Sequence, residues 1–340
     1  MRDLRRFAAP ALVAALLPAT AQAGTTSHVR TVVGHAQGGQ GQFGCATSGP
    51  QADIGAWFGS KTAGLPTEGY AACHLQGATI NNSGAGATSA VSSASQTISG
   101  NTATADASAH ASYTGAGASS SSNLTGGPYN FDFHQAESTT FVRDTLTFLA
   151  NADKGFVRIG FALDGAMHTA GTAEAFSELS YKVGNDHVYA MMSAKLSGPN
   201  SGRFYATYTP GFTDFTRTEH DFTIDGTVYS DAIPVTFGQG VDFTYALFTS
   251  AFSGTYGSYA QSLFGSTVKL TSISVVDAQG RPIDFTVHST SGTLYDAKGA
   301  HAVPSGVPEP ASWALLILGF GGVGAAARRR RAMPLQPAYA

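Results

Sequence analysis

Six acidic side chains fall within a short stretch of the chain and could act together. They are Asp214, Glu219, Asp221, Asp225, Asp231 and Asp242. A glycosidase holds two carboxylates about 5–10 Å apart across a sugar, and a calcium site gathers several oxygen ligands. The spacing matches neither template, and Asp225 precedes a glycine in a turn-like pair. We interpret these acids as solvated strand ends and turns, with a carbohydrate-active enzyme as the alternative.

Tyrosine side chains offer a second route to sugars. An aromatic ring presents apolar area with a polar rim, on which a sugar ring can stack. Five tyrosines in the second half of the chain are candidates if they face a groove: Tyr205, Tyr208, Tyr245, Tyr256 and Tyr259. The competing interpretation is that these rings fill the core.

Motifs for nucleophilic, metal and redox chemistry do not occur. The sequence has no G-x-S-x-G elbow, no C-x-x-C pair and no H-x-x-x-H pair, and its ten histidines are scattered singly. Such motifs set a nucleophile or metal ligands at the spacing that the chemistry needs. The sequence therefore predicts no catalytic residue, no metal site and no cofactor, and a protein that is not an enzyme.

The two cysteines, Cys45 and Cys73, are predicted to form a disulfide. Both fall in the part of the chain that we expect to be exported, where thiols tend to oxidise. A bond between them would close a loop of 29 residues and contribute about 3.5 kcal/mol in the chain-entropy model. A reactive thiol pair is the alternative, without a C-x-x-C spacing to support it.

The most specific pattern lies in the C-terminal region. Residues 307–314 read Val-Pro-Glu-Pro-Ala-Ser-Trp-Ala, and four consecutive arginines occupy 328–331. The uncharged, mostly apolar residues 311–327 are near the lower limit of about 17–25 residues for a membrane-spanning helix. Trp313 would anchor the outer end, and the arginines would keep the basic tail, residues 328–340, on the cytoplasmic side.

This combination of motif, short span and arginine cluster resembles the PEP-CTERM proteins, in the subtype with Trp and Ala after Pro-Glu-Pro. The resemblance implies recognition by an exosortase, a membrane enzyme that would cut near the motif and release or re-anchor the protein. It implies these recognition residues: Pro308, Glu309, Pro310, Trp313 and Ala314. It implies these stop and retention residues: Arg328, Arg329, Arg330 and Arg331. The family accompanies exopolysaccharide and biofilm systems of Gram-negative bacteria, and the same tail occurs on some ice-binding proteins.

The N-terminal residues have the features of a secretory signal peptide. Three arginines precede an apolar run at 7–17, and Ala21-Gln22-Ala23 gives a small-residue cleavage site. We predict a signal helix over residues 1–23, cleaved before Gly24, with the secretion translocon and signal peptidase as transient partners. Arg5-Arg6 hints at twin-arginine export, but the flanking residues fit poorly.

The exported part is weakly charged and acidic. Charged residues make up 12% of the chain, against about 25% in typical proteins. Residues 24–307 contain 12 basic and 20 acidic side chains, a net charge of −8. Since phosphate recognition needs a basic surface, the sequence argues against a nucleic-acid partner.

The exported body follows a period of two residues. From Thr102 to Tyr113, alanines alternate with polar residues, which is typical of a strand with one polar face. Gly100-Asn101 is predicted to be a hairpin loop, and residues 87–98 to be the partner strand. The alternative is that the Ser/Ala/Gly/Thr-rich section 84–127 is a flexible linker.

Similar alternation recurs through the rest of the body. The predicted strands are 143–148, 157–163, 188–196, 204–208, 220–224, 243–248, 268–276 and 283–287, with turns expected at Asp164-Gly165, Asp225-Gly226 and residues 278–280. Short strands without long amphipathic helices indicate an all-β protein: an antiparallel β-sandwich or jelly roll, with a β-helix as the alternative. The predicted organisation is a signal peptide (1–23), an exported β domain (24–302), a linker with the sorting motif (303–310), a transmembrane helix (311–327) and a basic tail (328–340).

The sequence thus favours an exported protein that is briefly anchored in the inner membrane and then reaches the cell envelope, surface or extracellular matrix. Its predicted role is structural or adhesive, in contact with exopolysaccharide of a biofilm matrix. Two alternatives remain: a carbohydrate-active enzyme using the acids at 214–242, and an ice-binding protein using the face that carries Thr102 and Thr104.

Overall fold

The computed structural model describes residues 23–36, 57, 73–76, 78–98, 100–126, 133–184, 187–197, 205–208, 215–254 and 257–301. The regular elements in these ranges are strands, and every pairing between them is antiparallel. The predicted all-β, antiparallel fold is confirmed. The β-helix alternative is wrong, because its coils pair strands in parallel.

The two ends of the chain are not part of this description. The signal peptide, apart from Ala23, and the predicted linker, membrane span and basic tail lie outside the described residues. In the part that is described, no helix is long and apolar enough to cross a membrane. The transmembrane helix at 311–327 stays a prediction.

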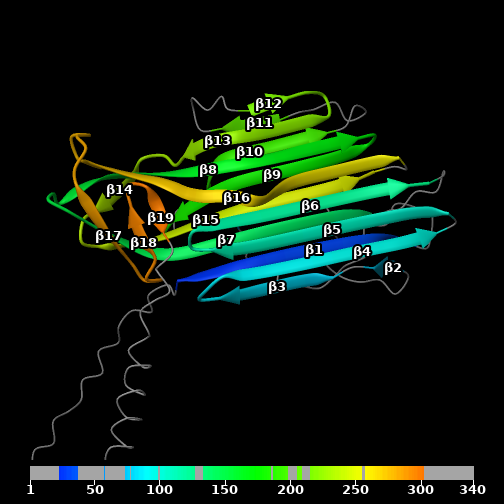
Figure 1. Cartoon of the computed structure of the whole chain (residues 1–340), viewed down its shortest axis with the longest axis horizontal. Helices are drawn as coiled ribbons and strands as arrows, with labels where there is room; N and C mark the ends of the chain where they lie inside the picture. The colour runs from blue at the N-terminus through cyan, green and yellow to red at the C-terminus, as the bar shows by residue number, and fades with distance from the viewer. Residues whose placement is uncertain are drawn as a thin grey trace, which may run out of the picture. The chain divides into compact units, whose positions relative to one another are not determined.

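Sheet A is one of two layers of strands. Its strands are β1 (Gly24–Ala36), β2 (Cys73–Gln76), β3 (Thr79–Gly84), β7 (Phe133–Ala150), β9 (Ala173–Val183), β10 (Tyr189–Ser197), β11 (Tyr205–Tyr208), β15 (Gly240–Ser253) and β17 (Phe285–Ser289). They are ordered β11-β10-β9-β15-β7-β1-β2, while β17 pairs with β7 and β3 pairs with β1. Figure 1 shows that the long strands of this sheet, such as β7 and β15, run along the long axis of the domain.

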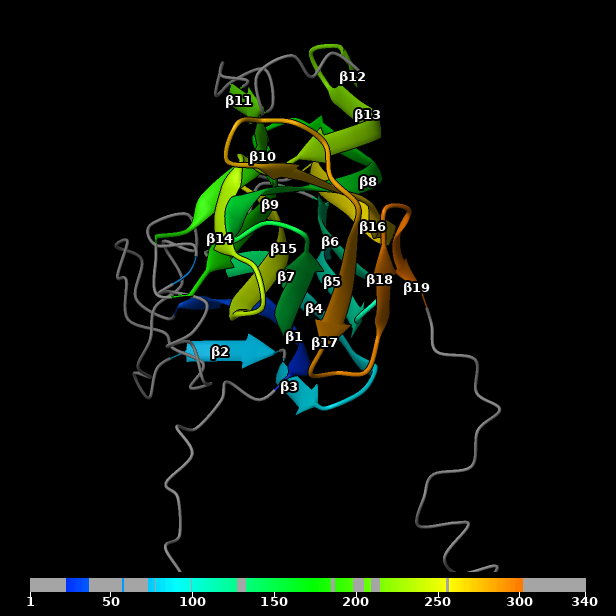
Figure 2. The ribbon, with the colours of Figure 1, turned by 90° about the vertical axis from the view of Figure 1, so that its left-hand side faces the viewer.

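Sheet B is the second layer. Its strands are β4 (Thr88–Ile98), β5 (Asn101–Ser112), β6 (Gly115–Thr125), β8 (Lys154–Ala170), β12 (Phe215–Arg217), β13 (Asp221–Tyr229), β14 (Ile233–Thr236) and β16 (Ser258–Asp277). The order is β12-β13-β8-β16-β6-β5-β4, with β14 beside β8. A small third sheet pairs β18 (Leu294–Asp296) with β19 (Gly299–His301). Turned by 90°, the two large sheets are seen stacked on each other (Figure 2).

The larger core lies between the two sheets. Phe161 and Leu163 of β8 and Phe264 of β16 face Leu179 and Leu247 of sheet A, and each is at most 1% exposed. Burying one such side chain contributes about 1.5–3 kcal/mol. This half of the sandwich therefore supplies most of the hydrophobic stabilisation.

The other half of the core is built mostly from alanine. Its buried alanines are Ala90, Ala94, Ala103, Ala105, Ala107, Ala109 and Ala136. Because alanine is short, the Cα atoms of β1 approach those of β4 and β5 to within 8 Å, closer than the usual spacing of about 10 Å between sheets. The alternation over 102–113 is thus confirmed as an alanine face turned inward. The flexible-linker alternative is wrong for the described residues of 84–127.

Buried hydroxyls bridge the sheets where the core is narrow. Thr31 Oγ1 lies 2.7 Å from Ser92 Oγ, and Ser120 Oγ lies 2.8 Å from Thr249 Oγ1. A buried hydroxyl is costly only when it lacks a partner. Serine-rich strands can therefore pack inside this sandwich without leaving these groups unsatisfied.

Two Asp-Gly pairs that were predicted as turns lie inside strands instead. Gly165 is in the middle of β8, and Gly226 is within β13 opposite Leu163. A Cβ on Gly165 would come 2.3 Å from the ring of Phe264. This glycine leaves room for an aromatic ring, so the prediction that the two pairs end their strands is wrong.

The hairpin between β4 and β5 is displaced by one residue from its predicted position. Ile98 pairs with Asn101, so Asn101 is already in the strand. Gly100 takes a φ of +82°, a conformation that glycine adopts without steric cost. The loop therefore lies between Ile98 and Asn101 and includes Gly100.

The remaining predicted strands fall in or overlap observed ones. Segments 143–148, 204–208, 243–248, 268–276 and 283–287 correspond to β7, β11, β15, β16 and β17, and the turn at 278–280 is confirmed. In β10 the register shifts between Ala190 and Met192. Met191 and Met192 are consequently both buried, and the simple alternation predicted over 188–196 is wrong there.

A buried carboxylate fastens the last part of the domain to sheet A. Asp144 of β7 is 5% exposed. Its Oδ1 accepts hydrogen bonds from Thr290 Oγ1 (3.0 Å) and the backbone N–H of Ser291 (3.1 Å). Its Oδ2 accepts from Ser291 Oγ (2.6 Å) and the Tyr295 hydroxyl (3.1 Å). Four protein donors thus replace the water that this charge loses on burial.

Candidate functional site

The outer face of sheet B carries a continuous line of polar side chains across six strands. Each member is the register partner of the next, from β4 through β5, β6, β16 and β8 to β13. In that order the members are Ser93, Asp106, Ser121, Gln261, His168 and Asp221. We call this line the polar row. It exists because the alternate residues of the same strands, such as the alanines of β5, are turned inward.

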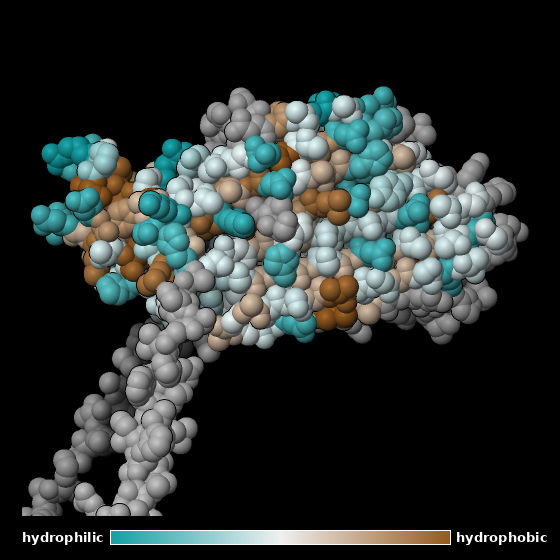
Figure 3. Space-filling view, viewed as in Figure 1, coloured by the Kyte–Doolittle hydropathy of each residue, from teal (hydrophilic) through white to brown (hydrophobic). Residues whose placement is uncertain are grey.

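The lines beside the polar row consist largely of small side chains. On one side, Ser95, Thr104, Asn123 and Tyr259 are register partners in turn. On the other side, Val91, Ser108, Ser119 and Leu263 are register partners in turn, and Val91 and Leu263 are 65% and 41% exposed. The space-filling view in Figure 3 shows that this face is mostly pale, with scattered hydrophilic residues and few apolar ones. The face is therefore weakly polar.

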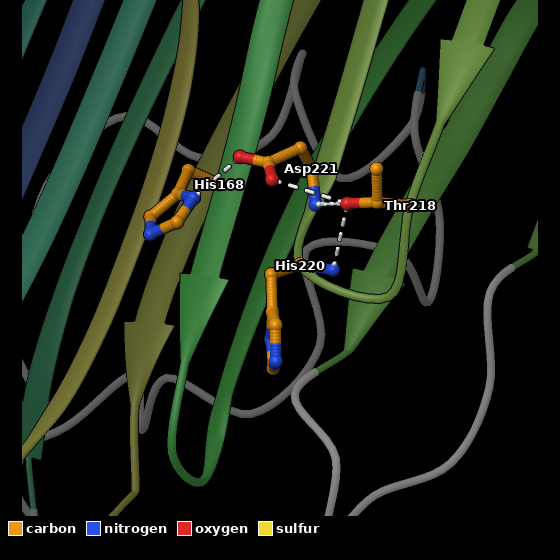
Figure 4. A network of polar contacts seen from close by, with 4 residues as sticks. All are labelled: His168, Thr218, His220 and Asp221. Atoms are coloured by element: carbon orange, nitrogen blue, oxygen red, sulfur yellow. Dashed lines mark hydrogen bonds and ion pairs between the residues drawn. The ribbon is translucent and has the colours of Figure 1, made fainter.

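At one end of the polar row, a histidine and an aspartate form a hydrogen-bonded pair (Figure 4). His168 Nδ1 lies 2.6 Å from Asp221 Oδ1. Thr218 Oγ1 donates to Asp221 Oδ2 (3.1 Å) and accepts from the backbone N–H groups of Asp221 and His220. The hydrogen bond with His168 holds the pKa of Asp221 below its usual value. The His220 side chain points away from this pair.

The pair orients the imidazole but does not form a nucleophilic site. A Ser-His-Asp site requires a hydroxyl that is hydrogen-bonded to the histidine. Here the threonine hydroxyl is bonded to the aspartate, and among the residues that the structure describes no hydroxyl is bonded to His168. The ring of Tyr259 lies 5.7 Å from the His168 ring, centroid to centroid. The arrangement could bind a ligand through the aromatic ring of Tyr259 and the oriented imidazole of His168.

The structure does not gather the five described acids of this stretch into one cluster. Asp214 lies outside the described residues, Glu219 and Asp231 are exposed in loops, and Asp242 of β15 accepts a hydrogen bond from Thr145 (2.7 Å). In the described part of the chain, no group of three potential metal ligands occurs. Asp221 and Asp225 share β13, whereas Glu219, Asp231 and Asp242 lie on other parts of the chain.

One of these acids has a partner that the sequence did not reveal. Asp225 of β13 is directly opposite Asp164 of β8, and both are exposed. Cβ atoms of opposite residues are about 4.5–5.5 Å apart. Only the sheet register could have identified Asp164, because it is remote in sequence from the acidic stretch.

The candidate tyrosines separate into different environments. Tyr245 is 2% exposed in the core, where burial raises its pKa, so core filling is its role. Tyr205 and Tyr208 are in β11, but their side chains are outside the description, as is Tyr256. Tyr259 is half-buried on the outer face of sheet B. Of the five candidates, Tyr259 is the one that the structure places beside other candidate binding groups.

Comparison with known proteins identifies the C-terminal region. Residues 306–331 match the family model described as the PEP-CTERM protein-sorting motif. The chain carries a PEP-CTERM sorting signal. Neither the curated proteins nor the solved structures that were compared gave a match.

The PEP-CTERM signal implies an exosortase substrate that is exported to the cell envelope or surface. The resemblance stated from Pro308–Ala314 and the arginines is thus confirmed at the level of the motif. The individual roles of these residues stay predictions, since they lie outside the described residues. The same holds for the disulfide: Cys73 begins β2, but Cys45 and the Cys73 side chain are not described.

An open hollow of about 620 Å³ lies away from the polar row. It is lined by the turn between β7 and β8 and by the turn after β16, including Lys154, Asp277 and Arg281. Arg281 Nε donates to Asp277 Oδ2 over 2.7 Å, and hydrogen bonds from Arg281 lower the pKa of Asp277. The two charges already satisfy each other, and none of the predicted site residues lines this hollow.

The outer face of sheet A hides charged groups that sequence reasoning missed. His28 and Arg30 of β1 and Glu137 of β7 are 3%, 2% and 5% exposed, and Arg30 is opposite Glu137. Burial, with a smaller effect from Arg30, lowers the pKa of His28 to about 4. Burial raises the pKa of Glu137 to about 7, although Arg30 opposes the shift. On the same face Trp57 packs edge-on against Phe141 at 5.4 Å.

Proposed function

We propose that this protein is a non-enzymatic structural or adhesive component of an exopolysaccharide matrix, processed by exosortase in a Gram-negative bacterium. The translocon and signal peptidase act first, and the predicted helix at 311–327 anchors the chain in the inner membrane until the sorting enzyme cuts. The observation that carries this proposal is the sorting motif at 306–331.

The body of the protein supports a role in contact with a polymer. The outer face of sheet B is broad and open, and it presents serine, threonine and amide groups at regular strand spacings. Hydroxyl and amide groups both donate and accept hydrogen bonds, as sugar hydroxyls do. A face of this kind can contact a hydrated polymer over many strands.

Mass spectrometry of the mature protein from cells tests the export route. We expect a chain that begins at Gly24, ends near Pro310 and lacks the arginines at 328–331. Recovery of the intact chain from the cytosol would contradict the route.

Retention by the matrix tests the adhesive role. The purified protein should be retained by exopolysaccharide from the producing strain, and a deletion strain should form a weaker biofilm. Absence of retention together with an unchanged biofilm would overturn the role.

The facing carboxylates of Asp164 and Asp225 favour a second candidate, a carbohydrate-active enzyme. Retaining glycosidases use carboxyl groups about 5–5.5 Å apart, similar to the separation of opposite positions in a sheet. Release of reducing sugar, abolished by Asp225→Asn, would establish this activity. No release from a broad glycan panel would dismiss it.

The threonines on the outer face favour a weaker candidate, ice binding. Thr102 lies between Thr97 and Thr125 in register, and its Oγ1 is 2.9 Å from that of Thr97. The line is only three threonines long. Thermal hysteresis at the level of the solvent would remove this candidate.

A further inference from the structure

We propose that the polar row is a binding track for a linear, uncharged glycan, which lies across the strands with one sugar ring stacked on Tyr259. The proposal rests on the matrix function above and specifies its binding site and class of glycan. It concerns residues on six strands that only the sheet register brings together.

The length of the polar row fits an oligosaccharide. Six neighbouring strands are separated by five spacings of about 4.8 Å each, so the polar row is about 24 Å long. Its side chains supply hydroxyl, amide, imidazole and carboxylate groups, which include both donors and acceptors. An extended chain of several sugar units can thus form hydrogen bonds along the whole track, whereas one sugar would use only a part.

The surroundings of the polar row are suited to a ligand that lies flat. The serines, threonine and asparagine of the neighbouring lines do not project far from the sheet. Tyr259 projects more, beside His168, and its ring can take up the apolar face of a sugar. Asp221 fixes the imidazole through the 2.6 Å contact. Fixing a side chain before binding reduces the conformational entropy lost on binding.

The charge of this surface selects among polymers. The polar row contains Asp106 and Asp221, and neither it nor the two neighbouring lines contains lysine or arginine. A uronate-rich polysaccharide or a nucleic acid would face like charges without a cation to compensate them. An uncharged polymer avoids this repulsion while it uses the same acceptors. Charge complementarity therefore favours a neutral glycan.

Affinity electrophoresis of the full-length protein can test the proposal. The gels would contain a neutral linear glucan, a neutral galactomannan or alginate as the acidic comparison. We expect retardation by at least one neutral polymer and at least tenfold weaker retardation by alginate at low ionic strength. Retardation by alginate alone, or by no polymer, would overturn the proposal. Retention by the native exopolysaccharide, measured separately, would then decide whether the matrix function itself stands.

Variants locate the site. Tyr259→Ala should weaken binding of the retarding glycan about tenfold or more. Ser121→Arg places a long side chain in the middle of the track and should also weaken it. The matched control is Tyr229→Ala, because Tyr229 is 41% exposed on β13, eight residues beyond Asp221. If both track variants keep their thermal stability and bind as the wild type does, or if the control loses binding equally, the polar row is not the site.

Discussion

Substitution of Glu137 by glutamine should reveal a pH dependence of folding stability that is not apparent in the wild-type protein. Folded Glu137 has a pKa of about 7, against 4.5 without the protein environment. The folded state therefore binds more protons than the unfolded state between these values, and stability falls as pH rises through this window. A shift of this size corresponds to about 3 kcal/mol. Glutamine does not carry the buried charge. The unfolding free energy of Glu137→Gln, relative to that of the wild type, should therefore rise by about 3 kcal/mol between pH 4.5 and pH 8.

His28 acts in the opposite direction. Its folded pKa is about 4, against 6.5 when unperturbed. The unfolded state binds more protons in that window, so stability rises with pH, again by about 3 kcal/mol. The two contributions nearly cancel between pH 4.5 and 6.5. His28→Gln should therefore gain stability relative to wild type at pH 4 and lose that advantage by pH 7.

Urea denaturation at pH 4, 5, 6, 7 and 8 measures both effects. The quantity of interest is the difference in unfolding free energy between variant and wild type at each pH. Glu219→Gln is the control, because this carboxylate is exposed, and its difference should stay below about 0.5 kcal/mol throughout. A difference for Glu137→Gln that does not change with pH would refute the assignment of a buried, easily protonated carboxylate.

Three further substitutions test other contacts. Asp144→Ala removes the acceptor of four hydrogen bonds and should lower the unfolding free energy, measured by urea denaturation, by at least about 3 kcal/mol. The control Asp221→Ala changes an exposed carboxylate and should lower it by less than about 1 kcal/mol. Gly165→Ala should lower the unfolding free energy by about 1–3 kcal/mol through overpacking. The control Gly86→Ala should be nearly neutral, because Gly86 has open space around it. Equal thermal midpoints of the two variants would contradict this. His168→Ala should raise the pKa of Asp221 in a carboxyl NMR titration, and an unchanged value would show that the 2.6 Å contact does not stabilise the carboxylate.

The strands with regular alternation could be predicted because their inward residues are all of one kind. In β5, five alanines leave a single interpretation of which face is buried. Glycine misled the prediction at Gly165, since a glycine that ends a strand and one that accommodates a ring look the same in sequence. The difference lies in a residue far along the chain, Phe264, and tertiary packing is not encoded locally.

The candidate site could be predicted only in parts. Asp221 and Tyr259 were identified as chemical groups, but their neighbours were not, because sheet register joins residues that are far apart in sequence. The buried charges were missed for a related reason. His28 and Arg30 alternate with inward residues of β1, a pattern that normally marks a solvated face. Their burial depends on what covers sheet A, which the strand's own sequence does not specify.

The two outer faces of the sandwich differ in a way that bears on function. On sheet A, Arg30 and Glu137 are almost inaccessible, and Trp57 packs on the same face. Around these residues that face is closed to a polymer, because a polymer would have to displace packed side chains. On sheet B, the members of the polar row are exposed or half-exposed and need no rearrangement before contact. Binding to an open, rigid face loses little conformational entropy, so a matrix polymer should contact the domain through sheet B.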